Sequence, residues 1–144
     1  MRYVMTLIYV PDVQKTMDFY EKAFGLKKKT LYPGNIYGEM ATGEIILGFA
    51  SEDYMKKELN QIQLRSNRPI NSPSSFELTF ISENVQKDYQ NALNSGAKAI
   101  SAPHPTLWSK SVAYVTDING IIVEIASQEM NPQSPQLTNL LDKK

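Results

Sequence analysis

The chain has 144 residues, the size of one ordinary domain or of two half-size modules that share a core. Fifteen basic residues balance fifteen acidic ones, so no global field favours nucleic acid or an anionic membrane, and we expect neither as a partner. The absence of cysteine excludes disulfides, thiolate metal sites and cysteine nucleophiles. The apolar run at 3–10 is too short to span a bilayer, and Pro11 follows it without a cleavage pattern. We therefore expect a soluble, cytoplasmic protein.

The first fifty residues predict a strand, a helix and three more strands. Residues 1–10 are rich in β-branched side chains, which favour a strand. Asp12 can cap a helix that ends at Gly25, because apolar residues recur between them at helical spacing. Apolar runs bounded by Pro-Gly and Thr-Gly turns predict strands at 26–32, 36–41 and 44–50. Residues 1–50 therefore predict a βαβββ module.

The same order restarts after a looser segment. Residues 51–75 are interpreted as a linker that contains a short helix within 52–64. Phe76 opens a strand, and Asn84 caps a second helix closed by Gly96. The remaining expected elements are a short strand at 99–102, a loop at 103–110 and a hairpin at 111–126. The second module is predicted to span 76–127, followed by a C-terminal tail at 128–144.

The hairpin carries one conspicuous acid. In SVAYVTDINGIIVEIA, Asn119-Gly120 joins two runs rich in Val and Ile, a strong hairpin signal. Glu124 is the only charge in the second run. Because side chains alternate along a strand, Glu124 must face either water or a concave polar spot.

An internal repeat links the two modules. VPDVQKTMDFYEKAFG and SENVQKDYQNALNSG align through Val-Gln-Lys at 13–15 and 85–87, an offset of 72 positions. This alignment indicates a duplicated unit. Two curved half-sheets of this kind usually join edge to edge and leave a cleft between their concave faces.

VPDVQKTMDFYEKAFGL and VAYVTDINGIIVEIAS resemble segments of the vicinal-oxygen-chelate superfamily, which includes glyoxalases, bleomycin-resistance proteins and dioxygenases. The resemblance covers about Met1 to Gln128. It implies an α+β fold in which paired βαβββ modules form a curved, partly closed mixed sheet with a central cleft, often in a homodimer. In metal-using members, the ligands come from the first and last strands of each module.

This chain departs from the superfamily's metal-ligand pattern. The first-strand positions fall on Met5 and, through the repeat offset, on Glu77. The last-strand positions fall on Glu124 and on Leu47, or on Ile46 if the turn is gapped differently. Relatives that bind transition metals place imidazole in this set, yet the chain has a single histidine. We expect no cofactor, with a divalent metal held by the two acids and water as the alternative.

Glu77 and Glu124 are the main candidate catalytic residues. If they meet in a partly buried cleft, repulsion and desolvation would raise at least one pKa, giving a proton-sharing pair suited to acid/base work or to a cationic ligand. The alternative is two acids on the solvent side of a half-covered sheet.

Six further residues are candidate ligand contacts. Met5 and Leu47 would line an apolar pocket, or would be ordinary core residues. Tyr37 and Tyr114 take similar places in the two modules and would line the cleft, although sheet packing explains them as well.

The other two candidates come from the segment APHPTLW. His104 is expected in a surface loop, with a role as a gate or in proton transfer as the alternative. Trp108 would stack on an aromatic ligand, bury itself at a dimer contact or simply pack within the fold.

Three functions remain open from the sequence. The first is a protein that binds a small organic molecule in the cleft without a transition metal. The second is a lyase or isomerase of the glyoxalase kind, with a divalent ion or acid/base carboxylates. The third is a non-catalytic dimerising module.

Overall fold

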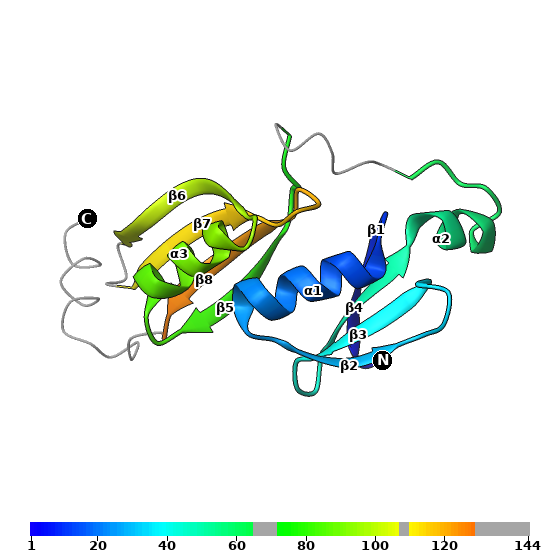
Figure 1. Cartoon of the computed structure of the whole chain (residues 1–144), viewed down its shortest axis with the longest axis horizontal. Helices are drawn as coiled ribbons and strands as arrows, with labels where there is room; N and C mark the ends of the chain where they lie inside the picture. The colour runs from blue at the N-terminus through cyan, green and yellow to red at the C-terminus, as the bar shows by residue number, and fades with distance from the viewer. Residues whose placement is uncertain (65–71, 107–109, 129–144) are drawn as a thin grey trace.

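The computed structural model describes residues 1–64, 72–106 and 110–128. Two four-stranded mixed sheets, each with a helix on one face, make up an α+β fold (Figure 1). The predicted pair of βαβββ units is therefore confirmed. The two sheets stay separate and do not close into one. No helix of the described residues is long and apolar enough to cross a membrane.

The first module forms sheet A. Its elements are β1 (Met5–Val10), α1 (Val13–Phe24), β2 (Lys27–Leu31), β3 (Tyr37–Ala41) and β4 (Ile46–Ser51). The strand order is β1-β4-β3-β2, with β1 parallel to β4 and the other pairs antiparallel. A short helix, α2 (Glu52–Glu58), follows directly.

The second module repeats this arrangement as sheet B. Its elements are β5 (Glu77–Ser82), α3 (Val85–Asn94), β6 (Lys98–Pro105), β7 (Ser111–Thr116) and β8 (Ile122–Ser127). The strand order is β5-β8-β7-β6, with β5 parallel to β8. The first strand of each module thus pairs with the last, as the duplicated sequence requires.

Helix α1 begins and ends where its sequence indicates. The side chain of Asp12 accepts a hydrogen bond from the backbone N–H of Lys15 at 3.0 Å. Gly25 ends the helix in the left-handed conformation, φ 68°, which glycine adopts without strain. The apolar stripe between them, which includes Met17 and Tyr20, is fully buried against sheet A. Burying each such side chain stabilises the fold by about 1.5–3 kcal/mol.

A buried polar network joins the modules. Helices α1 and α3 contact each other, and one apolar core includes residues of both modules. The Tyr20 hydroxyl of α1 donates to Asp117 at 2.7 Å, in the turn between β7 and β8. Asn119 of the same turn donates to the Thr16 hydroxyl at 2.9 Å. Burial raises the pKa of Asp117, and hydrogen bonds, including one from the backbone N–H of Ile121, partly offset this rise.

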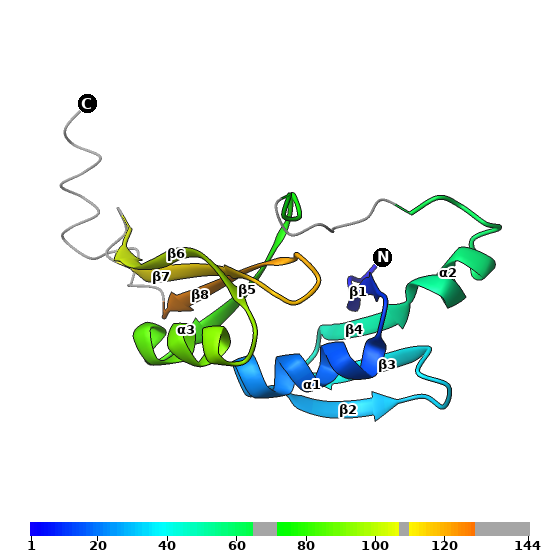
Figure 2. The same cartoon turned by 45° about the horizontal axis from the view of Figure 1, so that its top comes forward.

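Each sheet therefore has two unlike faces. One face packs on its helix, as the buried side chains of β4, β7 and β8 show. The opposite face of each sheet carries no helix (Figures 1 and 2). We call this the open face, and side-chain alternation decides which residues reach it.

The bond between Tyr20 and Asp117 should contribute measurably to stability. Replacement of Tyr20 by Phe removes a donor from a buried carboxyl group, so we expect the free energy of unfolding to fall by about 2 kcal/mol. Urea denaturation monitored by circular dichroism measures this change. Tyr54→Phe on the surface is the matched control and should leave the midpoint unchanged. Equal midpoints for the two variants would show that the bond is not needed to hold the modules together.

Candidate functional site

The open face of sheet B gathers both predicted acids. Parallel pairing sets Thr79 opposite Glu124, and antiparallel pairing sets Tyr114 opposite Glu124 on the other side. Glu77 lies two residues before Thr79 on β5, so it projects from the same face. Three of the predicted site residues, Glu77, Glu124 and Tyr114, thus share one surface.

Glu124 is buried and has two polar partners, Tyr114 and Lys110. It is only 9% exposed, because β8 lies inside the sheet between β5 and β7. The Tyr114 hydroxyl donates to one carboxylate oxygen at 2.9 Å. The ammonium of Lys110 lies 3.7 Å from the other oxygen. Burial, together with the bond to Glu124, raises the pKa of Tyr114 to about 12.

Glu77 stands at the edge of the same group and is more exposed. Desolvation of its carboxyl group is the main cause that raises its pKa, followed by the negative charge of Glu124 and a side-chain hydrogen bond with it. The Thr79 hydroxyl and the charge of Lys110 oppose this rise. The negative charge of Glu124 therefore disfavours ionisation of Glu77. We call Glu77, Lys110, Tyr114 and Glu124 the carboxylate cluster.

His104 lies in strand β6, and its expected place in a loop is wrong. It pairs with Val112 of β7, and its ring centroid is 6.3 Å from that of Tyr114. The side chain is exposed, and Nδ1 lies 2.8 Å from the carbonyl oxygen of Ala102. The strand continues through Pro103 and Pro105 because β6 lies at the edge of sheet B. A proline there, which lacks an N–H, need not break a hydrogen bond between strands.

Two more predicted contacts lie on the open face of sheet A. The Tyr37 hydroxyl is 3.8 Å from the sulfur of Met5 and donates to Glu39 at 2.6 Å. Lys29 pairs with Glu39 at 3.1 Å. Burial and the bond to Glu39 raise the pKa of Tyr37, and this bond lowers the pKa of Glu39. Sheet A thus carries its own tyrosine, carboxylate and lysine.

The repeat alignment predicted that Leu47 is the counterpart of Glu124 in sheet A, and this prediction is wrong. Glu124 lies opposite Thr79, and the equivalent of Thr79 on β1 is Leu7, which pairs with Gly48. The stretch from the turn glycine to the strand is one residue longer before β4 than before β8, so the counterpart of Glu124 is Gly48. Leu47 is a core residue on the helix side of sheet A and is only 6% exposed.

Four polar residues near these sites were not among the candidate site residues predicted from the sequence. Lys29 and Glu39 lie on sheet A, and Lys110 and Thr116 on sheet B. Glu39 could have been found, because it lies two residues from Tyr37 and so shares its face. Lys110 stood in the expected loop and gave no such signal. Trp108 lies outside the described residues.

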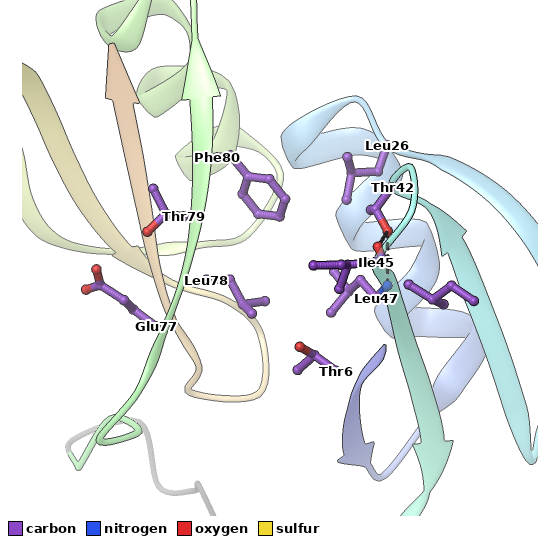
Figure 3. A pocket seen from close by; sticks show the side chains of 10 residues that line it. Thr6, Leu26, Thr42, Ile45, Leu47, Glu77, Leu78, Thr79 and Phe80 are labelled. Carbon is purple, nitrogen blue, oxygen red and sulfur yellow. Dashed lines mark hydrogen bonds between the residues drawn. The ribbon is translucent and has the colours of Figure 1, made fainter. Parts of the chain in front are cut away.

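A pocket of about 380 Å³ lies between the two modules. Leu78 and Phe80 point across it toward Leu26 and Leu47, whereas the carboxyl group of Glu77 points away (Figure 3). These apolar side chains belong to the helix side of their sheets. A single cleft between concave faces would place Met5 opposite Glu77 and Glu124. The pocket within one chain does not do this, because it lies on the helix side of the sheets.

The residues present do not fit a transition-metal site of the superfamily's kind. Among the described residues, no three His, Cys, Asp or Glu side chains are grouped so that they could hold a metal ion. Of the four matching strand positions, Gly48 offers no side-chain ligand, and Met5 offers only a thioether sulfur, which lies 3.8 Å from the Tyr37 hydroxyl. Only Glu77 and Glu124 could supply hard oxygen ligands.

Comparisons with known proteins agree with this fold. Residues 2–125 match the family model for the glyoxalase/bleomycin resistance protein/dioxygenase superfamily. The uncharacterized protein YraH of Bacillus subtilis (strain 168) is 26% identical over 126 residues, covering 87% of this chain and 97% of that protein.

Solved structures give the same result. A glyoxalase-related enzyme from Fulvimarina pelagi is similar with a TM-score of 0.74 at 14% identity, over 89% of this chain and 88% of that one. A glyoxalase/bleomycin resistance protein/dioxygenase family enzyme from Burkholderia phytofirmans PsJN is similar with a TM-score of 0.72 at 24% identity, over 85% of this chain and 95% of that one. At these identities, the similarity shows the fold alone.

Proposed function

This chain belongs to the glyoxalase/bleomycin resistance protein/dioxygenase superfamily, and from that premise we propose that it binds a small organic molecule on the open face of sheet B without a transition metal. The observation that carries this proposal is the buried carboxylate of Glu124, held among Tyr114, Lys110 and Glu77. Buried titratable groups that interact with one another at a surface are found more often at functional sites than elsewhere. The cytoplasmic location remains a prediction.

The chemistry of the carboxylate cluster favours a ligand with a cationic or hydroxyl group. Glu124 can accept hydrogen bonds, and Glu77 can donate when protonated or accept when ionised. His104 lies beside Tyr114 and borders the same surface. Such a small set of polar groups would orient a molecule whose remaining surface is apolar.

An acid/base enzyme is the second candidate function. The raised pKa of Glu77 favours it, because a carboxyl group that titrates closer to neutral pH transfers protons more effectively. In this case, Glu77 would exchange a proton with the bound substrate while Glu124 stabilises the charge that develops.

A screen of small molecules by thermal shift tests the binding proposal. A ligand that binds the folded protein raises the unfolding midpoint by mass action, and we expect organic amines and alcohols among the compounds that do so. Glu124→Gln should abolish these shifts, whereas Glu44→Gln on the surface should retain them. Metal analysis of the purified protein accompanies the screen. If no compound raises the midpoint, or if a stoichiometric transition metal depends on Glu124, the proposal fails.

We also propose that two copies associate as a homodimer, because one chain does not bring its two open faces together. In this arrangement, Met5 and Tyr37 of one copy would face the carboxylate cluster of the other. Strands β1 and β5 support this idea, since each is an edge of its own sheet. Sedimentation velocity should give the mass of a dimer at micromolar concentration. A monomer at all concentrations would contradict the shared site.

A further inference from the structure

Lys110 makes an unusual contact for a lysine. Its side chain is only 17% exposed, and its ammonium lies 3.7 Å from a carboxylate oxygen of Glu124, whose side chain is 11% exposed. This distance is longer than a direct hydrogen bond, which needs about 2.7–3.2 Å. The backbone of Lys110 is fixed by two bonds to Thr106, at 2.7 and 3.3 Å. The lysine therefore approaches Glu124 without making its best contact.

We propose that the ammonium of Lys110 occupies the place of the ligand's own cationic group, so that the ligand is a protonated primary amine that displaces it from Glu124. This inference rests on the proposed function, because it assumes that the carboxylate cluster is the binding site. A primary ammonium has the same three donors as a lysine side chain. A free amine can approach Glu124 at full hydrogen-bond distance, since no backbone holds it back.

Thr116 adds a second polar group, without a partner among the described residues, to the same face of sheet B. Its hydroxyl is buried and is the one buried side-chain polar atom without a hydrogen bond among the described residues. Thr116 lies two residues after Tyr114 on β7, so it shares the face of the carboxylate cluster. It pairs with Ile122, which pairs in turn with Glu77. A second polar group on the amine would satisfy this hydroxyl, which otherwise costs stability.

Protons should compete with the amine at this site. The groups that act on Glu77 are Glu124 on β8, Tyr114 on β7, Thr79 on β5 and Lys110, which directly precedes β7. When Glu77 is protonated, the cluster holds one negative and one positive charge, and an incoming cation gains little. When Glu77 ionises, the cluster gains a negative charge. Amine affinity should therefore rise as pH rises through the pKa of Glu77.

The alternative hypothesis is that Lys110 binds an anionic ligand. A ligand carboxylate would then contact its ammonium, and Glu124 would only hold the lysine in place. The position of Lys110 beside two acids disfavours this reading, because both would repel an anion. Removal of the lysine distinguishes the two: it should strengthen binding of a cation and weaken binding of an anion.

An NMR titration of four proteins with benzylamine, and with benzyl alcohol as its neutral analogue, tests the inference. The proteins are the wild type, Lys110→Met, Glu77→Gln and the control Lys28→Met, which removes a lysine paired with Asp18 and Glu21 away from the site. We expect Lys110→Met to bind benzylamine about tenfold more tightly than the wild type at neutral pH. Its affinity for benzyl alcohol should stay within about twofold, and Lys28→Met should match the wild type.

The pH series adds a second readout. The wild type should bind benzylamine less tightly at about pH 5 than at about pH 7, whereas Glu77→Gln should show no such difference, because the amine stays protonated throughout. Unchanged or weaker benzylamine binding by folded Lys110→Met overturns the inference, as does a pH dependence that survives in Glu77→Gln. If alcohols still bind through Glu124 while amines do not, only this inference fails. If nothing binds, the proposed function fails with it.

Discussion

The parallel pairing of β5 with β8 is the constraint on which the site depends. It places Glu124 on an inner strand of sheet B and Glu77 on the edge strand beside it. The inner acid is buried, accepts a hydrogen bond from Tyr114 and lies near the positive charge of Lys110, so its charge is compensated. Desolvation and the negative charge of Glu124 raise the pKa of the edge acid, although Thr79 and Lys110 oppose this rise. One pairing thus produces two carboxyl groups of unlike character on the same face.

The two modules share a fold but have diverged in chemistry. Gly48 takes the position of Glu124 in sheet A, so that sheet has no acid on its last strand. Its carboxylate is Glu39, on the neighbouring strand, and it pairs with Tyr37 and Lys29. A Cβ added at Gly48 would meet a methyl carbon of Leu7 at 3.0 Å, so neighbouring apolar side chains already fill this place. The two modules share an open face but carry their acids on different strands.

The sequence predicted the elements well because their signals are local. Apolar spacing, the Asp12 cap and the Gly25 stop define α1, and Asn119-Gly120 defines the last hairpin. Strand alternation limited Glu124 to either water or a concave polar spot, and the pairing of β7 with β8 then placed Tyr114 beside it. The sheet A counterpart of Glu124 was placed on Leu47 or Ile46 instead of Gly48, because turn length is not encoded in the pattern of either strand. The extent of β6 and the approach of Lys110 depend on tertiary pairing, which no local signal reports.

The central claim is that Glu77 and Glu124 act as one interacting pair on a ligand-binding face. A ¹³C NMR titration of the side-chain carboxyl groups, in the wild type and in Glu124→Gln, tests this most directly. We predict that Glu77 titrates above its ordinary value of about 4.3 in the wild type and moves back toward it in the variant, because the neighbouring charge is gone. A Glu77 that titrates at its ordinary value in both proteins would contradict the account.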